Sequence, residues 1–172
     1  MQRVMHVTVV TAVLLAVGIL NAVSAQSHTE ELEFVCEHLK RVSCGGGWTH
    51  IDATRCVKYF QTPKSFDDAQ AHCNSTGSDL VTFKTQQDVG KAVCITLHDN
   101  PKPKSFWVGV IRSAEGFTYT DGSEVKHAHW SVGQPNNAGG QENCVEMNYK
   151  DWGLWNDANC AAKHHFMCAK TM

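Results

Sequence analysis

The 172-residue sequence predicts an α+β fold for one disulfide-stapled domain. Three observations indicate this class: two amphipathic helical segments come first, short strand-like segments follow them, and eight cysteines follow an amino-terminal apolar run. Helices that precede strands along the chain are typical of α+β domains. The part after the apolar run, about 147 residues, is long enough for a single domain with its own hydrophobic core.

Residues 1–25 are interpreted as a secretory signal peptide. Arg3 supplies the positive charge, an apolar run covers residues 7–20, and small residues end the segment at Ala25. This run is shorter than the ~20 residues that cross a bilayer, so cleavage before Gln26 is favoured over a retained membrane anchor. The mature protein is therefore expected to be secreted and extracellular, without membrane insertion.

The cysteines behind this signal indicate a disulfide framework. No two of them lie closer than eight positions apart, so the Cys-x-x-Cys spacing of zinc sites is absent. Asn74 begins an Asn-Ser-Thr sequon and is a candidate glycosylation site in the same compartment. The eight cysteines are Cys36, Cys44, Cys56, Cys73, Cys94, Cys144, Cys160 and Cys168.

The first half of the chain predicts a lead-in and two helices. Residues 26–43 form a polar lead-in that is compatible with a helix, and the domain is expected to cover residues 44–170, with a loop and a short strand over residues 44–60. Ser65 and Thr85 each precede an acidic residue by three positions, the pattern of a capping box. The first helix is expected to stop near Gly77 and the second before Pro101.

The second half predicts short strands around a long loop. Residues 106–111 read as a buried strand, residues 117–119 as an alternating strand before an Asp-Gly turn, and residues 144–149 and 165–169 as two further strands. Residues 130–140 show no periodicity. A long loop without periodicity inside a compact domain is often functional.

The amide-rich segment QPNNAGGQENC, residues 134–144, carries the strongest chemical signal together with Trp155-Asn156-Asp157. Calcium takes six to eight oxygen ligands from carboxylates, amide carbonyls, backbone and water. With a cis bond before Pro135, the amide oxygens of Gln134 and Asn136 would converge on one ion. Glu142 would approach from the far end of the loop. These residues predict a calcium site.

At these positions the sequence resembles the C-type lectin-like domains, in their long form with an extra amino-terminal disulfide. Residues 106–110, FWVGV, match the WIGL-like core strand of that family, and residues 155–157 match its WND motif. Residues 130–149 are similar to small soluble lectins and to their type II antifreeze relatives. The resemblance implies two helices, small antiparallel sheets and a long calcium-binding loop region.

The resemblance also implies pairings and ligands. It implies three disulfides, Cys44–Cys56, Cys73–Cys168 and Cys144–Cys160. Cys36 and Cys94 then remain, either as a bridge within the chain, which is preferred, or as links between two chains of a homo-oligomer. The calcium and sugar ligands that it implies are Gln134, Asn136, Glu142, Asn156 and Asp157.

Such a site binds a sugar through two vicinal hydroxyls, which complete the calcium shell and exchange hydrogen bonds with the ligand side chains. Without calcium, the carboxylates lose their counter-charge and the loop is expected to lose its anchor. A single sugar offers few apolar atoms, so affinity is expected to be weak and useful avidity to need several copies of the site.

The motif Gln134-Pro135-Asn136 departs from the family pattern. Mannose-type sites carry Glu-Pro-Asn and galactose-type sites carry Gln-Pro-Asp, so this chain has two ligand carboxylates, Glu142 and Asp157, in place of three. Fewer charges weaken calcium binding. Gln134 slightly favours galactose over mannose, although the loop has no aromatic ring for galactose unless Trp152 reaches it.

The leading interpretation is a secreted calcium-dependent lectin that recognises exposed glycans such as microbial surface sugars, as in innate immunity. The alternatives are an antifreeze-type ice-binding protein, a protein-recognition module, or a loop that binds nothing. His127 and His129 would share a face of a strand, but no third zinc ligand lies at useful spacing. No catalytic motif is present, so the chain is not expected to be an enzyme. The net charge of −2 gives no reason to expect nucleic acid.

Overall fold

The structure is a computed structural model that describes residues 32–100 and 102–172. The predicted signal peptide lies outside the described residues. The chain divides into two units, Met1–Leu39 and Lys40–Met172. In the described part of the first unit, residues 32–38 form a helix, which agrees with a helical lead-in. Among the described residues, no helix has both the length and the apolar character needed to cross a membrane.

The second unit is built on one mixed sheet. Its main path runs β1-β2-β3-β9-β5-β7-β8, while β4 pairs with β9 and β6 with β5. The β5–β9 pair is parallel and all the other strand pairs are antiparallel. The elements are β1 (Ser43–Gly45), β2 (Trp48–His50), β3 (Arg55–Lys64), α2 (Phe66–Ser75), β4 (Asp79–Leu80), α3 (Gln86–Asp99), β5 (Phe106–Ser113), β6 (Gly116–Tyr119), a 3-10 turn (Ala138–Gly140), β7 (Glu142–Met147), β8 (Trp155–Asn159) and β9 (His164–Thr171).

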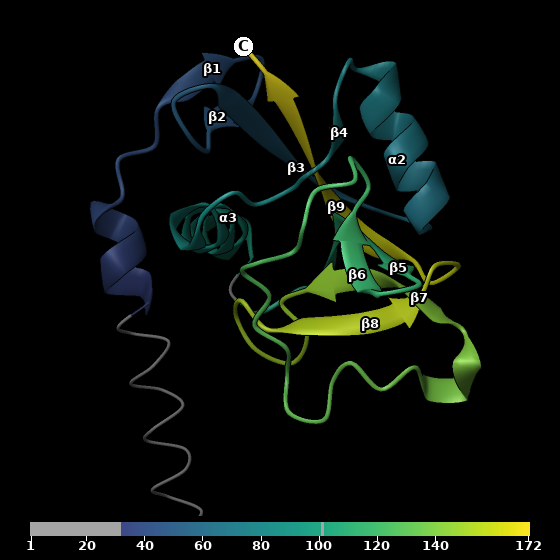
Figure 1. The fold of residues 1–172 in the computed structure, drawn as a ribbon. Coiled ribbons are helices and arrows are strands. Elements are labelled where there is room, and N and C mark those ends of the chain that lie inside the picture. The colour runs from purple at the N-terminus through teal and green to yellow at the C-terminus, as the bar shows by residue number, and fades with distance from the viewer. Residues whose placement is uncertain (1–31, 101) are drawn as a thin grey trace, which may run out of the picture. The chain divides into compact units, whose positions relative to one another are not determined.

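Two distant parts of the chain form the centre of the sheet. β3 pairs with β9 from Arg55 opposite Thr171 to Lys64 opposite His164. β7 and β8 extend the other side of the sheet, and Figure 1 shows the long segment between β6 and β7 at the end of this unit away from β1 and β2. The loop that carries the predicted ligands is therefore held by β7 and β8.

Both predicted helices are confirmed, with the caps that the sequence indicates. The Ser65 side chain accepts a hydrogen bond from the Asp68 amide at the start of α2. Thr85 and Asp88 form a reciprocal capping box at the start of α3, and Asn100 caps its end. These caps satisfy amide groups that have no partner inside the helix.

The prediction for residues 44–60 is wrong in two respects. A loop followed by one short strand was expected, but β1 and β2 form a hairpin there, and β3 runs for ten residues. The turn uses Gly46 and Gly47, whose φ angles of 60° and 80° suit glycine. β3 is long because β9 supplies a backbone partner along most of its length. The strand predicted over residues 144–149 is β7, which begins and ends two residues earlier.

Three disulfides hold the second unit, and they are the pairs that the resemblance implies. Cys44–Cys56 joins β1 to β3, Cys73–Cys168 joins α2 to β9, and Cys144–Cys160 joins β7 to the turn after β8. Cys36 and Cys94 are also disulfide-bonded. That these two bond to each other stays a prediction. The core packs around the buried side chains of Phe66, Leu80, Trp107, Phe166 and Cys73.

A buried ion cluster ties β3 to the start of α3. The Arg55 guanidinium lies 2.6 Å from Asp52 Oδ2 and 2.8 Å from Asp88 Oδ2, and it donates to the Thr82 carbonyl at 2.7 Å. Arg55 and Asp88 are both buried. Burial by itself would raise the pKa of Asp52, but hydrogen bonds from Thr54 and Arg55 outweigh it and hold that pKa well below its ordinary value.

This depressed pKa predicts an acid-sensitive contribution to stability. Asp52 favours the folded state above its unfolded pKa of about 3.9, and the contribution is lost as pH falls below that value. Asp52→Asn keeps a hydrogen-bond acceptor but removes the charge. Between pH 4 and pH 2 the wild type is therefore expected to lose more unfolding free energy than Asp52→Asn, as measured by urea unfolding at each pH. Parallel losses in the two proteins would contradict the assignment.

Candidate functional site

The loop before β7 is attached to β8 at its start. The Ser131 amide donates to the Trp155 carbonyl at 2.9 Å, and the Trp155 amide donates to the His129 carbonyl at 2.8 Å. The Gln134–Pro135 peptide bond is cis, as the sequence analysis expected. Asn137 has a φ of 49°, and the chain turns back through Ala138–Gly140. The amide-rich segment lies against β8, where the Asn136 and Asn137 amides both donate to Asp157.

Asp157 is the most enclosed of the predicted ligands, with no exposed surface. Its Oδ1 accepts from the Asn136 amide at 2.9 Å, and its Oδ2 accepts from the Asn137 amide at 2.7 Å. Oδ2 also lies 2.6 Å from Nη2 of Arg112, on β5. The carboxylate therefore anchors the backbone just after the cis proline.

Glu142 closes the other end of the loop and is half-buried. Its Oε2 accepts from the Ala138 amide at 2.7 Å, and its own amide donates to Asn137 Oδ1 at 3.1 Å. The Ala138 amide is shared with Asn136 Oδ1 at 2.9 Å. The loop backbone thus brings Asn136, Glu142 and Asp157 into one hydrogen-bonded group.

Asn156 is buried next to Asp157 on β8, and a residue of the neighbouring strand β7 orients its side chain. Its Nδ2 donates to Glu146 Oε1 at 2.8 Å, across the β7–β8 pair. Since the amide nitrogen is used in this way, the Asn156 oxygen is the atom left for a ligand role. Glu146 is itself buried, and its Oε2 lies 3.5 Å from His164 Nε2.

The side-chain oxygen of Gln134 lacks a partner among the described residues. Gln134 Oε1 is one of four buried side-chain atoms there without a hydrogen-bond partner, the others being His72 Nε2, Glu146 Oε2 and Trp155 Nε1. An unsatisfied buried acceptor costs about 1–3 kcal/mol, so such an atom points to a cation or donor that completes it. The oxygen-only donor set of this loop fits calcium. Within the described residues, no hydrogen bond joins the Gln134 or Asn156 side chain to Asn136, Glu142 or Asp157.

Two residues near the site were missed in the sequence analysis. Arg112 reaches Asp157 from a position 45 residues away, and Glu146 positions Asn156 from the opposite strand. The sequence carries a weak signal for each, because a charged residue ends the buried strand of residues 106–111 and another interrupts the apolar run after Cys144. Their partners depend on strand register, which the sequence does not show.

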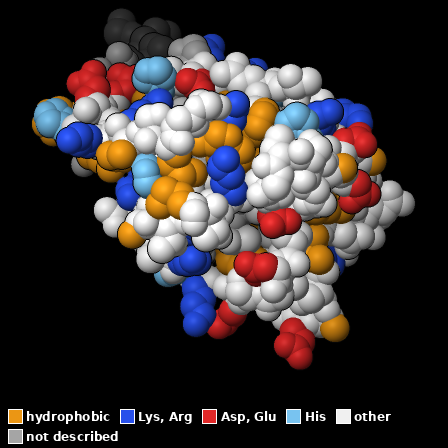
Figure 2. Space-filling view, turned by 90° about the horizontal axis from the view of Figure 1, so that it is seen from above, with side chains coloured by type: hydrophobic (Ala, Val, Ile, Leu, Met, Phe, Trp, Pro, Cys, Tyr) orange, Lys and Arg blue, Asp and Glu red, His pale blue; other side chains and the backbone are white. Residues whose placement is uncertain are grey.

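Trp152 does not present its ring to a sugar, because its side chain is buried. The large apolar side chain exposed next to Gln134 is Val132, at 98%. Trp155 and Trp107 are core residues. A groove lined by Gln70 of α2 and by residues of β4 and β9, among others, contains none of the predicted ligands. On the face shown in Figure 2, acidic and basic side chains are interspersed.

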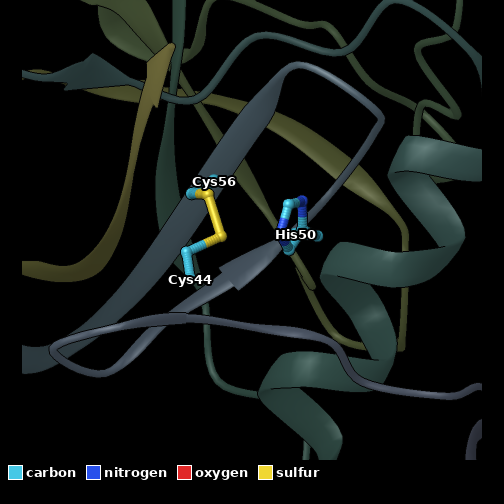
Figure 3. A group of neighbouring side chains, drawn as sticks. All are labelled: Cys44, His50 and Cys56. Carbon is cyan, nitrogen blue, oxygen red and sulfur yellow. A yellow bond between two sulfur atoms is a disulfide. The ribbon is translucent and has the colours of Figure 1, made fainter. Parts of the chain in front are cut away.

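Within the described residues, one cluster of three neighbouring His, Cys, Asp or Glu side chains has ligand atoms close enough together to hold a metal ion. It consists of Cys44, His50 and Cys56. Figure 3 shows that the two sulfur atoms are bonded to each other, with the His50 ring beside them. Sulfur atoms in a disulfide are not thiolates and do not bind zinc in that state. His127, the other histidine weighed as a zinc ligand together with His129, has its Nε2 3.1 Å from the Lys84 carbonyl oxygen.

Comparison with known proteins agrees with this fold. The lectin C-type domain family matches residues 62–170. C-type isolectin Sp-CL4 of Scorpaena plumieri is 43% identical over 134 residues, which cover 78% of this chain and 93% of that protein. The galactose-specific lectin nattectin of Thalassophryne nattereri is 28% identical over 133 residues, which cover 76% of this chain and 82% of that lectin.

Solved structures show the same fold. The C-type lectin CEL-I from Cucumaria echinata is 25% identical, with a TM-score of 0.67 over 74% of this chain and 97% of that one. A calcium-independent type II antifreeze protein is 26% identical, with a TM-score of 0.59 over 78% of this chain and 98% of that one. The family match spans more than half of the sequence. The chain therefore belongs to the C-type lectin domain family of carbohydrate-binding proteins.

Proposed function

We propose that this protein is a secreted calcium-dependent lectin that binds exposed glycans through Gln134, Asn136, Glu142, Asn156 and Asp157. The observation that carries the proposal is the buried Oε1 of Gln134, which has no hydrogen-bond partner in the described part of the chain and belongs to a loop rich in side-chain oxygens. A bound calcium ion would give that oxygen a partner, and it would supply open coordination positions for two sugar hydroxyls. Asp157 and Glu142 provide the negative charge that such an ion needs.

Galactose-type glycans are the favoured ligands, with mannose-type glycans next. Gln134 supports galactose, and the similar fish lectin nattectin is described as galactose-specific. The site lacks an exposed aromatic ring, since Trp152 is buried. The weak contact area of one sugar favours use of the site in several copies, and the glycan-coated surface of a microbe offers such repeated ligands.

A glycan array with the mature protein tests this function. With millimolar calcium, signal is expected on terminal galactose in preference to mannose, and a chelator is expected to remove it, because the sugar hydroxyls then lose their metal contact. The same array in chelator is the control for calcium-independent adhesion. Binding that survives chelation would sink the calcium-dependent site, and silence on every glycan together with thermal hysteresis at millimolar protein would favour the ice-binding alternative.

A further inference from the structure

Arg112 is a fixed cation inside the predicted calcium site. It lies near the end of β5, and three groups hold its guanidinium. Nη2 is 2.6 Å from Asp157 Oδ2, Nε donates to the Glu142 carbonyl at 3.0 Å, and the guanidinium carbon is 4.6 Å from the centre of the Phe117 ring. A guanidinium with two directed hydrogen bonds and a ring against one face has little freedom to move.

The acceptor positions of Asp157 are almost filled without a metal ion. A carboxylate offers about four lone-pair positions on its two oxygens. The Asn137 amide and Arg112 use both positions on Oδ2, and the Asn136 amide uses one on Oδ1. About one position, on Oδ1, therefore remains for a cation. Arg112 and a metal ion can bind this carboxylate at the same time, through different oxygens.

The charges of the site show what Arg112 contributes. Two carboxylates, Glu142 and Asp157, carry −2, and Arg112 brings the sum to −1. A buried carboxylate without a cationic partner is strongly unfavourable. Asp157 has no exposed surface, and Arg112 is its partner in the only ion pair that the described residues give it. Arg112 thus compensates the buried charge of Asp157, whose two oxygens also accept from the Asn136 and Asn137 amides, when no metal is bound.

We propose that Arg112 is a resident counter-cation that keeps the loop of residues 134–142 anchored to Asp157 in the absence of calcium. This inference rests on the proposed function in assigning the loop to calcium. It replaces the expectation from the sequence that the loop loses its anchor once calcium is removed. The loop is then already folded when calcium arrives, and calcium adds to the site without having to organise it.

Hydrogen exchange of the backbone amides of Asn136 and Asn137, measured by NMR in chelator, tests the role of Arg112. In the wild type these amides are expected to be protected. In Arg112→Gln they are expected to exchange at least about tenfold faster, since the Asp157 charge has lost its partner. Arg112→Lys keeps the charge and is expected to fall between the two. Lys102→Gln removes one positive charge from an exposed position and serves as the matched control.

Exchange of the Val145 and Met147 amides in β7 reports whether each variant is folded. Equal protection of the Asn136 and Asn137 amides in wild type and Arg112→Gln, or no protection in the wild type, overturns the inference. Calcium is then added to both proteins, and restored protection in Arg112→Gln shows that calcium can take the place of Arg112 as the cationic partner of Asp157. The exchange measurement in chelator tests the role of Arg112 whether or not the protein binds calcium. A protein that keeps its loop in chelator but shows no response to calcium overturns the proposed function alone.

Discussion

Glu142→Gln is expected to abolish calcium-dependent glycan binding and to leave the fold intact. Glu142 supplies one of only two ligand carboxylates, so the substitution lowers the ligand charge from −2 to −1 and, with Arg112 counted, the charge of the site from −1 to 0. The glutamine oxygen can still accept from the Ala138 amide, which now bonds to the carboxylate at 2.7 Å. Calcium affinity is expected to fall at least about tenfold, by analogy with the loss caused by changes around metal ligands.

Calcium titrations of binding to an immobilised glycan, in wild type and variant, measure this effect. The matched control is Glu115→Gln, which removes the same charge from the exposed turn between β5 and β6. The control is expected to bind with the wild-type calcium midpoint. If Glu142→Gln also keeps that midpoint, Glu142 is not a ligand and the assignment of the loop must change.

The helices of this fold follow from the sequence because their signals are local. The Ser65 and Thr85 side chains each accept a hydrogen bond from the backbone amide of the aspartate three positions later. Both caps are therefore present. The β1–β2 hairpin was missed because its strands are three residues each and are defined by pairing, of β1 with β2 and of β2 with β3. Short strands of this kind owe their structure to neighbours, and a local pattern does not reveal them.

The site divides in the same way. The loop from Gln134 to Glu142 was predicted from its residue types, and the structure shows the cis bond before Pro135 and the contacts of Asp157 with the loop backbone. Arg112 and Glu146 were not predicted, because their roles depend on which residues face each other across β5, β7 and β8. The residues that would touch an ion are visible in the sequence, and those that hold them in place are set by tertiary packing.

Arg55→Ala is expected to lower the free energy of unfolding by about 3–5 kcal/mol. The substitution leaves the buried Asp88 charge without its cationic partner. Asp88 Oδ2 lies 2.8 Å from the Arg55 guanidinium, and Asp88 is only 3% exposed. The substitution also leaves the Thr82 carbonyl without its donor, which is now at 2.7 Å. Urea unfolding at pH 7 with the disulfides intact measures the loss.

A double-mutant cycle separates the ion pair from the packing of the arginine. Asp88→Asn removes the charge but keeps an oxygen that can accept at the start of α3, where Asp88 now accepts from the Lys84 amide at 2.9 Å. If the unpaired charge causes the loss, adding Asp88→Asn to Arg55→Ala is expected to recover part of the stability, since no buried charge then remains. Lys84→Ala, at an exposed neighbouring position, is expected to change stability by no more than about 0.5 kcal/mol. If the two losses of unfolding free energy are strictly additive, Arg55 and Asp88 have no coupling energy. Arg55 would then stabilise β3 and α3 through packing, and its charge would contribute nothing through Asp88.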